Sequence, residues 1–354
     1  MIIREVKSLL LYVIIIGLML FIGGCPYDDD VDEDNDEDVV CDGQPSECFE
    51  PLYGWRFEGK VIDEPDFMDV SVVRLDDGRY RLYGNASSNP NPGQRGFDSF
   101  ISDDGVSFQK EDGYRLAGPG IFMPFVITLP DGNFRLYFTD QEVVIGEEGG
   151  RAIMSAISDD GIDFTVEEGD RLTYSGNDYE SSGIRGAKIL ELDDESYRMY
   201  YHGIDNGNCW RVLSAVSQDG LEWTRENGAR IDPSDLCPPA TRIGNAAPFI
   251  TSDGVYHLYI ATGTCKENYA NGKFGIFDFT SMDGLTFTPC EEPIIENYFK
   301  ANSYTGDPSD PAVMPQDPAV IMTGSGLRMY LGVYDGPHVI EESAIYSLIH
   351  ESIV

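Results

Sequence analysis

One pattern of short apolar runs and tight turns recurs along this 354-residue chain and limits the folds it can adopt. Its first copy, residues 69–108, reads DVSVVRLDDGRYRLYG, then a polar loop, then DSFISDDGVSF. In each half, two runs of alternating apolar and polar residues meet at an Asp-Gly pair, Asp77-Gly78 or Asp104-Gly105. Asp-Gly tolerates the positive φ of a tight β-turn. The copy therefore predicts four short antiparallel strands in two hairpins.

The pattern then returns along most of the chain. Later copies contain LPDGNFRLYF with AISDDGIDFT, LDDESYRMYY with AVSQDGLEWT, TSDGVYHLYI with FTSMDGLTFT, and finally TGSGLRMYLG. The glycines of the second hairpins are 56, 59 and 64 residues apart, at Gly105, Gly161, Gly220 and Gly284. Four-strand units at such a period are typical of a β-propeller. We expect an all-β protein with five four-stranded antiparallel blades; an open β-sandwich is the alternative.

The fifth copy is incomplete. It ends in AIYSLIHES and has no Ser-x-Asp-Gly hairpin of its own. The segment Trp55–Ile62, WRFEGKVI, has the pattern of the missing strand. We expect this N-terminal strand to close the ring, because closure removes the open edge of a truncated sheet.

The N-terminus predicts export. Residues 1–24 have a short basic start, an apolar run and small residues before Cys25, as in a secretory signal peptide. The tetrapeptide IGGC at residues 22–25 is similar to the bacterial lipobox, which implies that Cys25 is lipidated. We expect a lipid-anchored protein of the bacterial cell envelope or surface; an uncleaved membrane anchor is the alternative. Residues 25–50 would be a tether and residues 51–354 the propeller.

The chain is strongly acidic, with a formal net charge of −38. Nine of the eleven residues from Asp28 to Asp38 are acidic, which predicts an extended, solvated tether. A calcium-binding reading of this run lacks the glycine turn of an EF-hand loop. So acidic a protein repels nucleic acid and anionic lipid, so we expect neither as a partner and expect membrane contact only through the lipid. We expect a monomer.

Seven cysteines agree with export, one for lipidation and six to pair. Equivalent positions in the third and fourth copies suggest the pairs within each blade. The predicted disulfides are Cys209–Cys237, Cys265–Cys290 and Cys41–Cys48.

The repeat also separates scaffold from site, because a residue type found in every copy serves the architecture. By this criterion we expect structural roles for three sets of residues. These are Tyr83, Tyr137, Tyr200, Tyr259 and Tyr330; Arg81, Arg135, Arg198 and Arg328; and the Ser-x-Asp-Gly aspartates.

Positions that differ between copies are candidates for function. The first residues of the five innermost strands should ring the axis at one mouth, where propellers hold their ligands. These residues are Asp69, Met123, Gly186, Asn245 and Asp317. Loops at the same face should add His202, Trp210, Asp140, Asn85 and His338.

These features resemble the five-bladed glycosidase superfamily, which includes glycoside hydrolase family 43. The resemblance rests on the strand openings DVSVV and DPAVI and on the repeated D-G-x-Y-R-x-Y hairpins, over residues 55–350. It implies inverting hydrolysis by an aspartate base from blade one, a second aspartate from blade two and a glutamate acid from blade three. The base carries over to Asp69, whereas Met123 and Arg185 occupy the other two positions.

Three interpretations follow. In the first, a glycosidase uses Asp69 as base and a loop carboxylate, Glu180 or Asp178, as acid. In the second, the propeller binds glycans without catalysis, and in the third it is a surface interaction protein. The expected substrate-binding residues are Asp317, Arg185, Asn245, Arg242, His202 and Trp210.

Several contacts at the mouth have two readings. Arg185 and Arg242 could clamp an acidic sugar, or they could simply neutralise Asp69 and Asp317. The aromatic residues that could stack on a sugar are Phe122, Trp210 and Tyr304. No zinc or phosphate-binding motif is present, so we expect no cofactor, and the sequence leaves open whether an axial cation binds Asp69 or Asp317.

Overall fold

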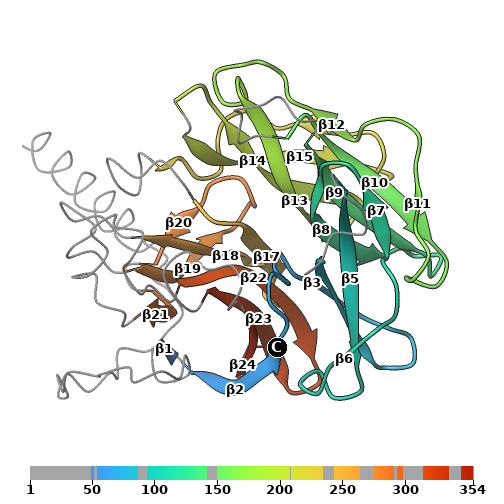
Figure 1. Cartoon of the computed structure of the whole chain (residues 1–354). Coiled ribbons are helices and arrows are strands. Elements are labelled where there is room, and N and C mark those ends of the chain that lie inside the picture. The colour runs from blue at the N-terminus through green and yellow to red at the C-terminus, as the bar shows by residue number, and fades with distance from the viewer. Residues whose placement is uncertain are drawn as a thin grey trace, which may run out of the picture. The chain divides into compact units, whose positions relative to one another are not determined.

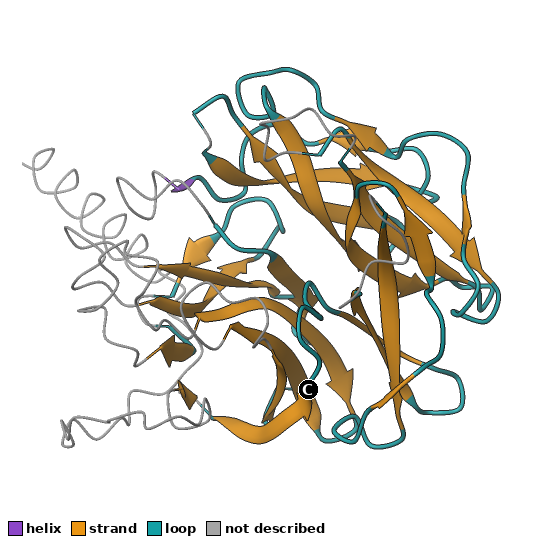
Figure 2. Cartoon of the chain, viewed as in Figure 1, coloured by secondary structure: helices purple, strands orange, loops and turns teal. Residues whose placement is uncertain are grey.

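The computed structural model divides the chain into two compact units, residues 1–36 and 37–354. The described residues all belong to the second unit. They are 49–51, 54–86, 94–141, 150–207, 209–233, 243–263, 274–290, 293–297, 314–334 and 344–353. Figure 2 shows that this part of the chain consists almost entirely of strands joined by loops.

The strands form five antiparallel sheets, which are the five blades (Figure 1). From the innermost strand outward, blade one has β3 (Ser71–Arg74), β4 (Tyr80–Asn85), β5 (Arg95–Ser102) and β6 (Gln109–Lys110); blade two β8 (Ile121–Thr128), β9 (Phe134–Asp140), β10 (Ala152–Ser158) and β11 (Thr165–Val166); blade three β13 (Gly183–Glu191), β14 (Tyr197–Ile204), β15 (Trp210–Ser217) and β16 (Thr224–Arg225); blade four β17 (Ala246–Ile250), β18 (Tyr256–Gly263), β19 (Phe274–Ser281) and β20 (Thr288–Pro289); and blade five β22 (Met314–Thr323), β23 (Gly326–Tyr334), β24 (Ala344–His350) and β2 (Trp55–Ile62).

The blades close into a ring. The innermost strands touch one another in the order β3, β8, β13, β17, β22 and back to β3. In Figure 1, the N-terminal strand β2 lies beside the C-terminal strand β24, and the two pair from Trp55↔His350 to Ile62↔Ile345. The predicted fold and its closure by the N-terminal strand are therefore confirmed.

Each blade also has short strands that the sequence did not predict. β7 (Leu116–Gly118) pairs with β5, and β12 (Leu172–Thr173) pairs with β10. In blade four, β21 (Ile295–Asn297) pairs with β19, and β1 (Phe49–Pro51) then adds to β21. The third strand of these blades is thus flanked by two short segments rather than by one long outer strand.

An arginine and a tyrosine of one blade grip the hairpin turn of the next. In blade one, Arg81 donates to the carbonyl of Asp160 at 2.8 Å, and the Tyr83 hydroxyl donates to the carbonyl of Gly161 at 2.9 Å. Gly161 has a φ of +72°, and a Cβ there would lie 2.7 Å from the Tyr83 hydroxyl. The same bonds recur from blade two to three, three to four and five to one, at Arg135 and Tyr137, Arg198 and Tyr200, and Arg328 and Tyr330.

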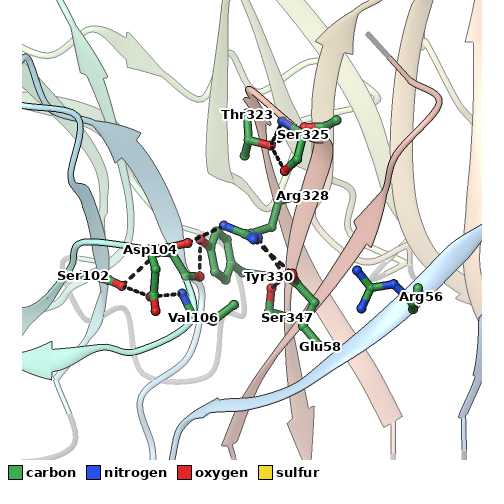
Figure 3. A network of polar contacts seen from close by, with 12 residues as sticks. Arg56, Glu58, Ser102, Asp104, Val106, Thr323, Ser325, Arg328, Tyr330 and Ser347 are labelled. Atoms are coloured by element: carbon green, nitrogen blue, oxygen red, sulfur yellow. Dashed lines mark hydrogen bonds and ion pairs between the residues drawn. The ribbon is translucent and has the colours of Figure 1, made fainter.

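Each of these arginines also binds a glutamate of its own blade, which in turn accepts from a serine. The pairs are Arg81–Glu111, Arg135–Glu167, Arg198–Glu226 and Arg328–Glu58. Figure 3 shows the set in blade five, where Glu58 comes from β2 and binds both Arg328 and Ser347. The predicted structural roles of these arginines and tyrosines are confirmed.

Blade four departs from this rule. His257 stands where the other blades have arginine, and its imidazole pairs with Asp278 at 2.9 Å. Blade five has no Ser-x-Asp-Gly hairpin, so it offers no turn carbonyl for an arginine to bind. Tyr259 instead packs edge-on against Trp55 of β2, with ring centroids 5.8 Å apart.

The apolar core lies between neighbouring blades rather than at one centre. One cluster joins blades one and two through Tyr83, Phe97, Leu136 and Phe138. Others lie between blades two and three, three and four, and five and one. Each blade is therefore stabilised mainly by its two neighbours, as expected for a repeat architecture.

The cysteines give a partial outcome. Cys209 is a free thiol, so the structure lacks the expected Cys209–Cys237 bridge. The loop around Cys209 is closed instead by Asp205, whose carboxylate accepts from the backbone N–H groups of Gly207 and Cys209. Cys290 is disulfide-bonded. The remaining cysteines, Cys25, Cys41, Cys48, Cys237 and Cys265, lie outside the described residues, so the other two pairings stay predictions.

A candidate active site at the propeller axis

The axial residues share an unusual backbone conformation. Asp69, Met123 and Asp317 have φ values of 56°, 56° and 49°, and Gly186 has 68°. In blades two, three and five the register of the innermost strand shifts at this residue, as in a β-bulge. A non-glycine residue in this region costs about 1–3 kcal/mol, and such strain is concentrated at functional sites.

The side chain of Asn245 links two carboxylates at the axis. Its Nδ2 donates to Asp317 Oδ1 at 2.7 Å and to Asp69 Oδ1 at 3.0 Å. Asn85 Nδ2 donates to the other oxygen of Asp69 at 2.5 Å, while Asn85 Oδ1 accepts from the backbone N–H of Met123. Residues of blades one, two, four and five are therefore joined in one hydrogen-bonded cluster.

The two carboxylates differ in their surroundings. Asp317 is 8% exposed, whereas Asp69 is partly exposed. Burial, followed by the neighbouring charge of Asp69, raises the pKa of Asp317 to about 7. The pair thus shares one proton near neutral pH, and Asp69 is the member that solvent can reach.

Lys188 supplies the positive charge of this cluster, and the sequence reasoning missed it. Its side chain is 2% exposed, with Nζ 5.2 Å from the ring centroid of Phe125. Burial lowers the pKa of Lys188, and the charges of Asp69 and Asp317 oppose that shift. The available signal was a lysine inside the apolar run GAKILEL of an innermost strand.

His202 and Asn245 both present an unpaired acceptor beside Gly186. His202 Nε2 lies 3.1 Å from the carbonyl of Gly244, so Nε2 carries the hydrogen and Nδ1 is the acceptor. His202 Nδ1 and Asn245 Oδ1 are buried and have no partner in the structure. A Cβ on Gly186 would lie 3.4 Å from that Nδ1 and 2.6 Å from that Oδ1. Burial, then the charge of Arg185, lowers the pKa of His202 to about 3, so the ring is neutral.

Arg185 lies at the rim of the same site. Its guanidinium carbon is 4.3 Å from the ring centroid of Trp210 and 5.3 Å from that of Phe122. Arg185 and Trp210 are partly exposed, and Phe122 is buried. The structure thus brings together the predicted residues Asp69, Asp317, Asn245, His202, Arg185 and Trp210.

Glu180 does not belong to this group, which corrects the expectation that it supplies a proton. Its carboxylate is fully buried and binds Arg225 at 2.9–3.1 Å and the hydroxyl of Tyr201 at 2.6 Å. Burial raises its pKa, but the bonds from Arg225, Tyr201 and the Ser175 N–H outweigh burial and hold the pKa below its usual value. An ionised carboxylate that is committed to an arginine cannot act as a general acid.

The other candidates take no part in the cluster. Asp140 pairs with Arg151 at 2.8 Å, and Asp178 is exposed. Arg242, Tyr304 and His338 lie outside the described residues. Within the described part of the chain, no group of three or more histidine, cysteine, aspartate or glutamate residues could hold a metal ion. Among those same residues, no helix has the length and apolarity needed to cross a bilayer.

Fold and site together define a five-bladed propeller with a polar cluster on its axis. No protein-family profile and no curated protein matches the sequence. Solved structures with this fold include a thermostable family-43 glycoside hydrolase, at 18% identity and TM-score 0.57 over 82% of this chain and 89% of that chain. An endo-1,4-β-xylanase from Bacteroides thetaiotaomicron matches at 15% identity and TM-score 0.55 over 82% and 92%. A family-32 β-fructofuranosidase from Bombyx mori matches at 14% and 0.57 over 82% and 61%.

Proposed function

We propose that this protein acts on glycans at the propeller axis and hydrolyses a glycosidic bond with Asp69 as general base. The observation that carries the proposal is the position of Asp69, a partly exposed carboxylate fixed by the amides of Asn85 and Asn245. The fold shared with glycoside hydrolases of families 43 and 32 supports the substrate class.

In this reaction Asp69 takes a proton from water, and the water oxygen attacks the anomeric carbon. The bond from that carbon to the leaving oxygen breaks, and the leaving oxygen must gain a proton. Asp317 lies beside Asp69, since both accept from one amide nitrogen. Inverting hydrolysis instead places the acid roughly 6.5–9.5 Å from the base, with water between them. Asp317 therefore limits the charge of the pair and is not the acid.

Glycan binding without turnover is the second candidate. It is favoured by the two positions where the glycosidase resemblance implies other groups. Arg185 stands where that resemblance implies the acid, and Glu180 is committed to Arg225. A propeller with a base and no acid would bind a sugar and leave ordinary glycosides intact.

The need for an acid separates these candidates experimentally. A glycosyl fluoride leaves without protonation, whereas an alkyl glycoside does not. The full-length protein should be assayed with panels of both and on a glycan array, with Asp69→Asn as the control variant. Turnover of either panel that is lost in Asp69→Asn supports hydrolysis, and turnover of fluorides alone shows a base without an acid. Array binding without any turnover favours the second candidate, and no signal in any assay contradicts both.

We also propose that the protein is exported, lipidated at Cys25 and monomeric. The leader and the IGGC tetrapeptide support export and lipidation. Cells labelled with radioactive palmitate should yield a labelled band that Cys25→Ala abolishes. An unlabelled wild-type band would contradict lipidation, and light scattering of the purified protein would test the monomer.

A further inference from the structure

The guanidinium of Arg185 is held in place before any ligand arrives. Trp210 and Phe122 contact it at 4.3 and 5.3 Å from their ring centroids. Cation–π contacts on the faces of a guanidinium leave its N–H groups directed around the edge of the plane. Such an edge suits the two oxygens of a carboxylate or sulfate.

Arg185 is not the counterion of the axial carboxylates. No ion pair joins it to Asp69 or to Asp317, although all three residues are described. The buried Lys188 has that role, since the charges acting on it are those of Asp69 and Asp317. The reading in which Arg185 only neutralises the axial pair is therefore unnecessary.

The inner part of the site requires hydrogen-bond donors. Asn245 is 3% exposed and His202 is 2% exposed, and each keeps one acceptor without a partner beside Gly186. A buried polar atom without a partner costs about 1–3 kcal/mol, so a ligand that donates to both is favoured. The ring hydroxyls of a sugar are such donors.

We propose that the axial site selects sugars that carry an anionic substituent, which Arg185 binds at the rim while ring hydroxyls donate to Asn245 and His202. The inference rests on the proposed function and names its substrate class. With a net charge of −38, the protein gives a polyanion no general attraction, so selectivity must come from this local contact. The anionic substituent is a carboxylate or a sulfate.

Matched probes test the proposal by calorimetry on the full-length protein. One pair is an oligogalacturonate and its fully methyl-esterified form, and the other is a sulfated galactan oligosaccharide and its desulfated form. We expect the charged member of one pair to bind roughly tenfold or more tightly than its neutral partner, as for hydrogen bonds to a charged group. The pair that shows this preference identifies carboxylate or sulfate.

Variants assign the preference to Arg185. Arg185→Gln should remove it and leave the affinity for the neutral probe unchanged within about twofold. Arg185→Lys, which keeps charge but loses the planar fork, should retain only part of it. The control is Arg74→Gln, since Arg74 is an exposed arginine that also lies over a ring, that of Tyr80, at 6.0 Å. It should bind like the wild type.

The outcomes separate the two proposals. Equal binding of charged and neutral probes, or an Arg185→Gln protein that keeps the preference, overturns the anionic selectivity and leaves glycan binding intact. Failure of all four probes, together with silence on the glycan array and in the turnover assays, overturns both. Unfolding curves of each variant confirm that a lost signal does not come from misfolding.

Discussion

Arg328 and Glu58 are 270 residues apart in the sequence and form a two-armed ion pair, with bonds of 2.8 and 3.0 Å. Glu58 belongs to the strand that closes the ring, and Arg328 also holds the hairpin turn of blade one through the carbonyl of Asp104. One arginine therefore joins the N-terminal strand, blade five and blade one. The pair is largely buried, with side chains 8% and 14% exposed.

Glu58→Gln should weaken ring closure. It leaves the buried guanidinium of Arg328 without its counterion, which typically costs about 3–5 kcal/mol. Urea unfolding measures the loss. Arg56→Ala is the control, because Arg56 lies in the same strand and forms an exposed pair with Glu351, 61% and 71% exposed. That change should stay within about 0.5 kcal/mol, and a similar loss in both variants would contradict the assigned role of Glu58.

Asp317→Asn should change the pH dependence of stability. The pKa of Asp317 is raised to about 7 in the folded protein from an ordinary value of 3.8. A raised pKa contributes stability that is complete below pH 3.8 and is lost as the pH rises through 7. The variant lacks this loss, so its Tm minus that of the wild type should increase between pH 4 and pH 8. A constant difference would mean that Asp317 does not titrate in this range.

Lys188→Met should raise the pKa of the axial pair further. The charge of Lys188 lowers the pKa of Asp317, so its removal lets the pair hold its proton to higher pH. Carbonyl NMR of ¹³C-labelled aspartates measures this pKa directly. Lys110→Met is the control, because the Lys110 amine is paired with Glu64 and Asp98 away from the axis. An unchanged titration in Lys188→Met would contradict the role of Lys188 as counterion.

Glu180→Gln should act on stability rather than on chemistry. It leaves Arg225 without a carboxylate, and we expect a loss of about 3–5 kcal/mol. Any hydrolysis by the fraction that remains folded should continue at the wild-type rate per folded molecule. A stable variant that has lost turnover would instead restore Glu180 as the acid.

Most of the fold could be predicted because it repeats. Asp-Gly turns and period-2 strands recur often enough that the blade count and the closing role of Trp55–Ile62 follow from the sequence alone. The axial residues Asp69, Met123, Gly186 and Asp317 were also found by counting from the turns, and their positive φ values agree.

The failures concern side chains whose roles depend on distant partners. Glu180 is adjacent in sequence to the predicted site, but Arg225 of β16 binds its carboxylate, and no sequence pattern reveals that pairing. Lys188 looked like part of an apolar strand because its counterions come from blades one and five. Short strands such as β7 and β12 were missed because two or three residues carry too little periodicity.

The exception in blade four offers the sharpest test of how the blades are joined. His257→Arg would install the residue that the other four blades carry, and a consensus argument expects a gain in stability. The local partners predict the opposite, because Cys290 occupies the position of the glutamate and blade five has no Ser-x-Asp-Gly turn to accept a bond. The buried guanidinium would have Asp278 alone, so we expect a loss of about 2–4 kcal/mol in urea unfolding. The reverse change, Arg198→His, should cost a similar amount, since it leaves Glu226 unpaired and the carbonyl of Asp283 without its donor. A stabilised His257→Arg protein would show that the arginine does not depend on the turn of the next blade.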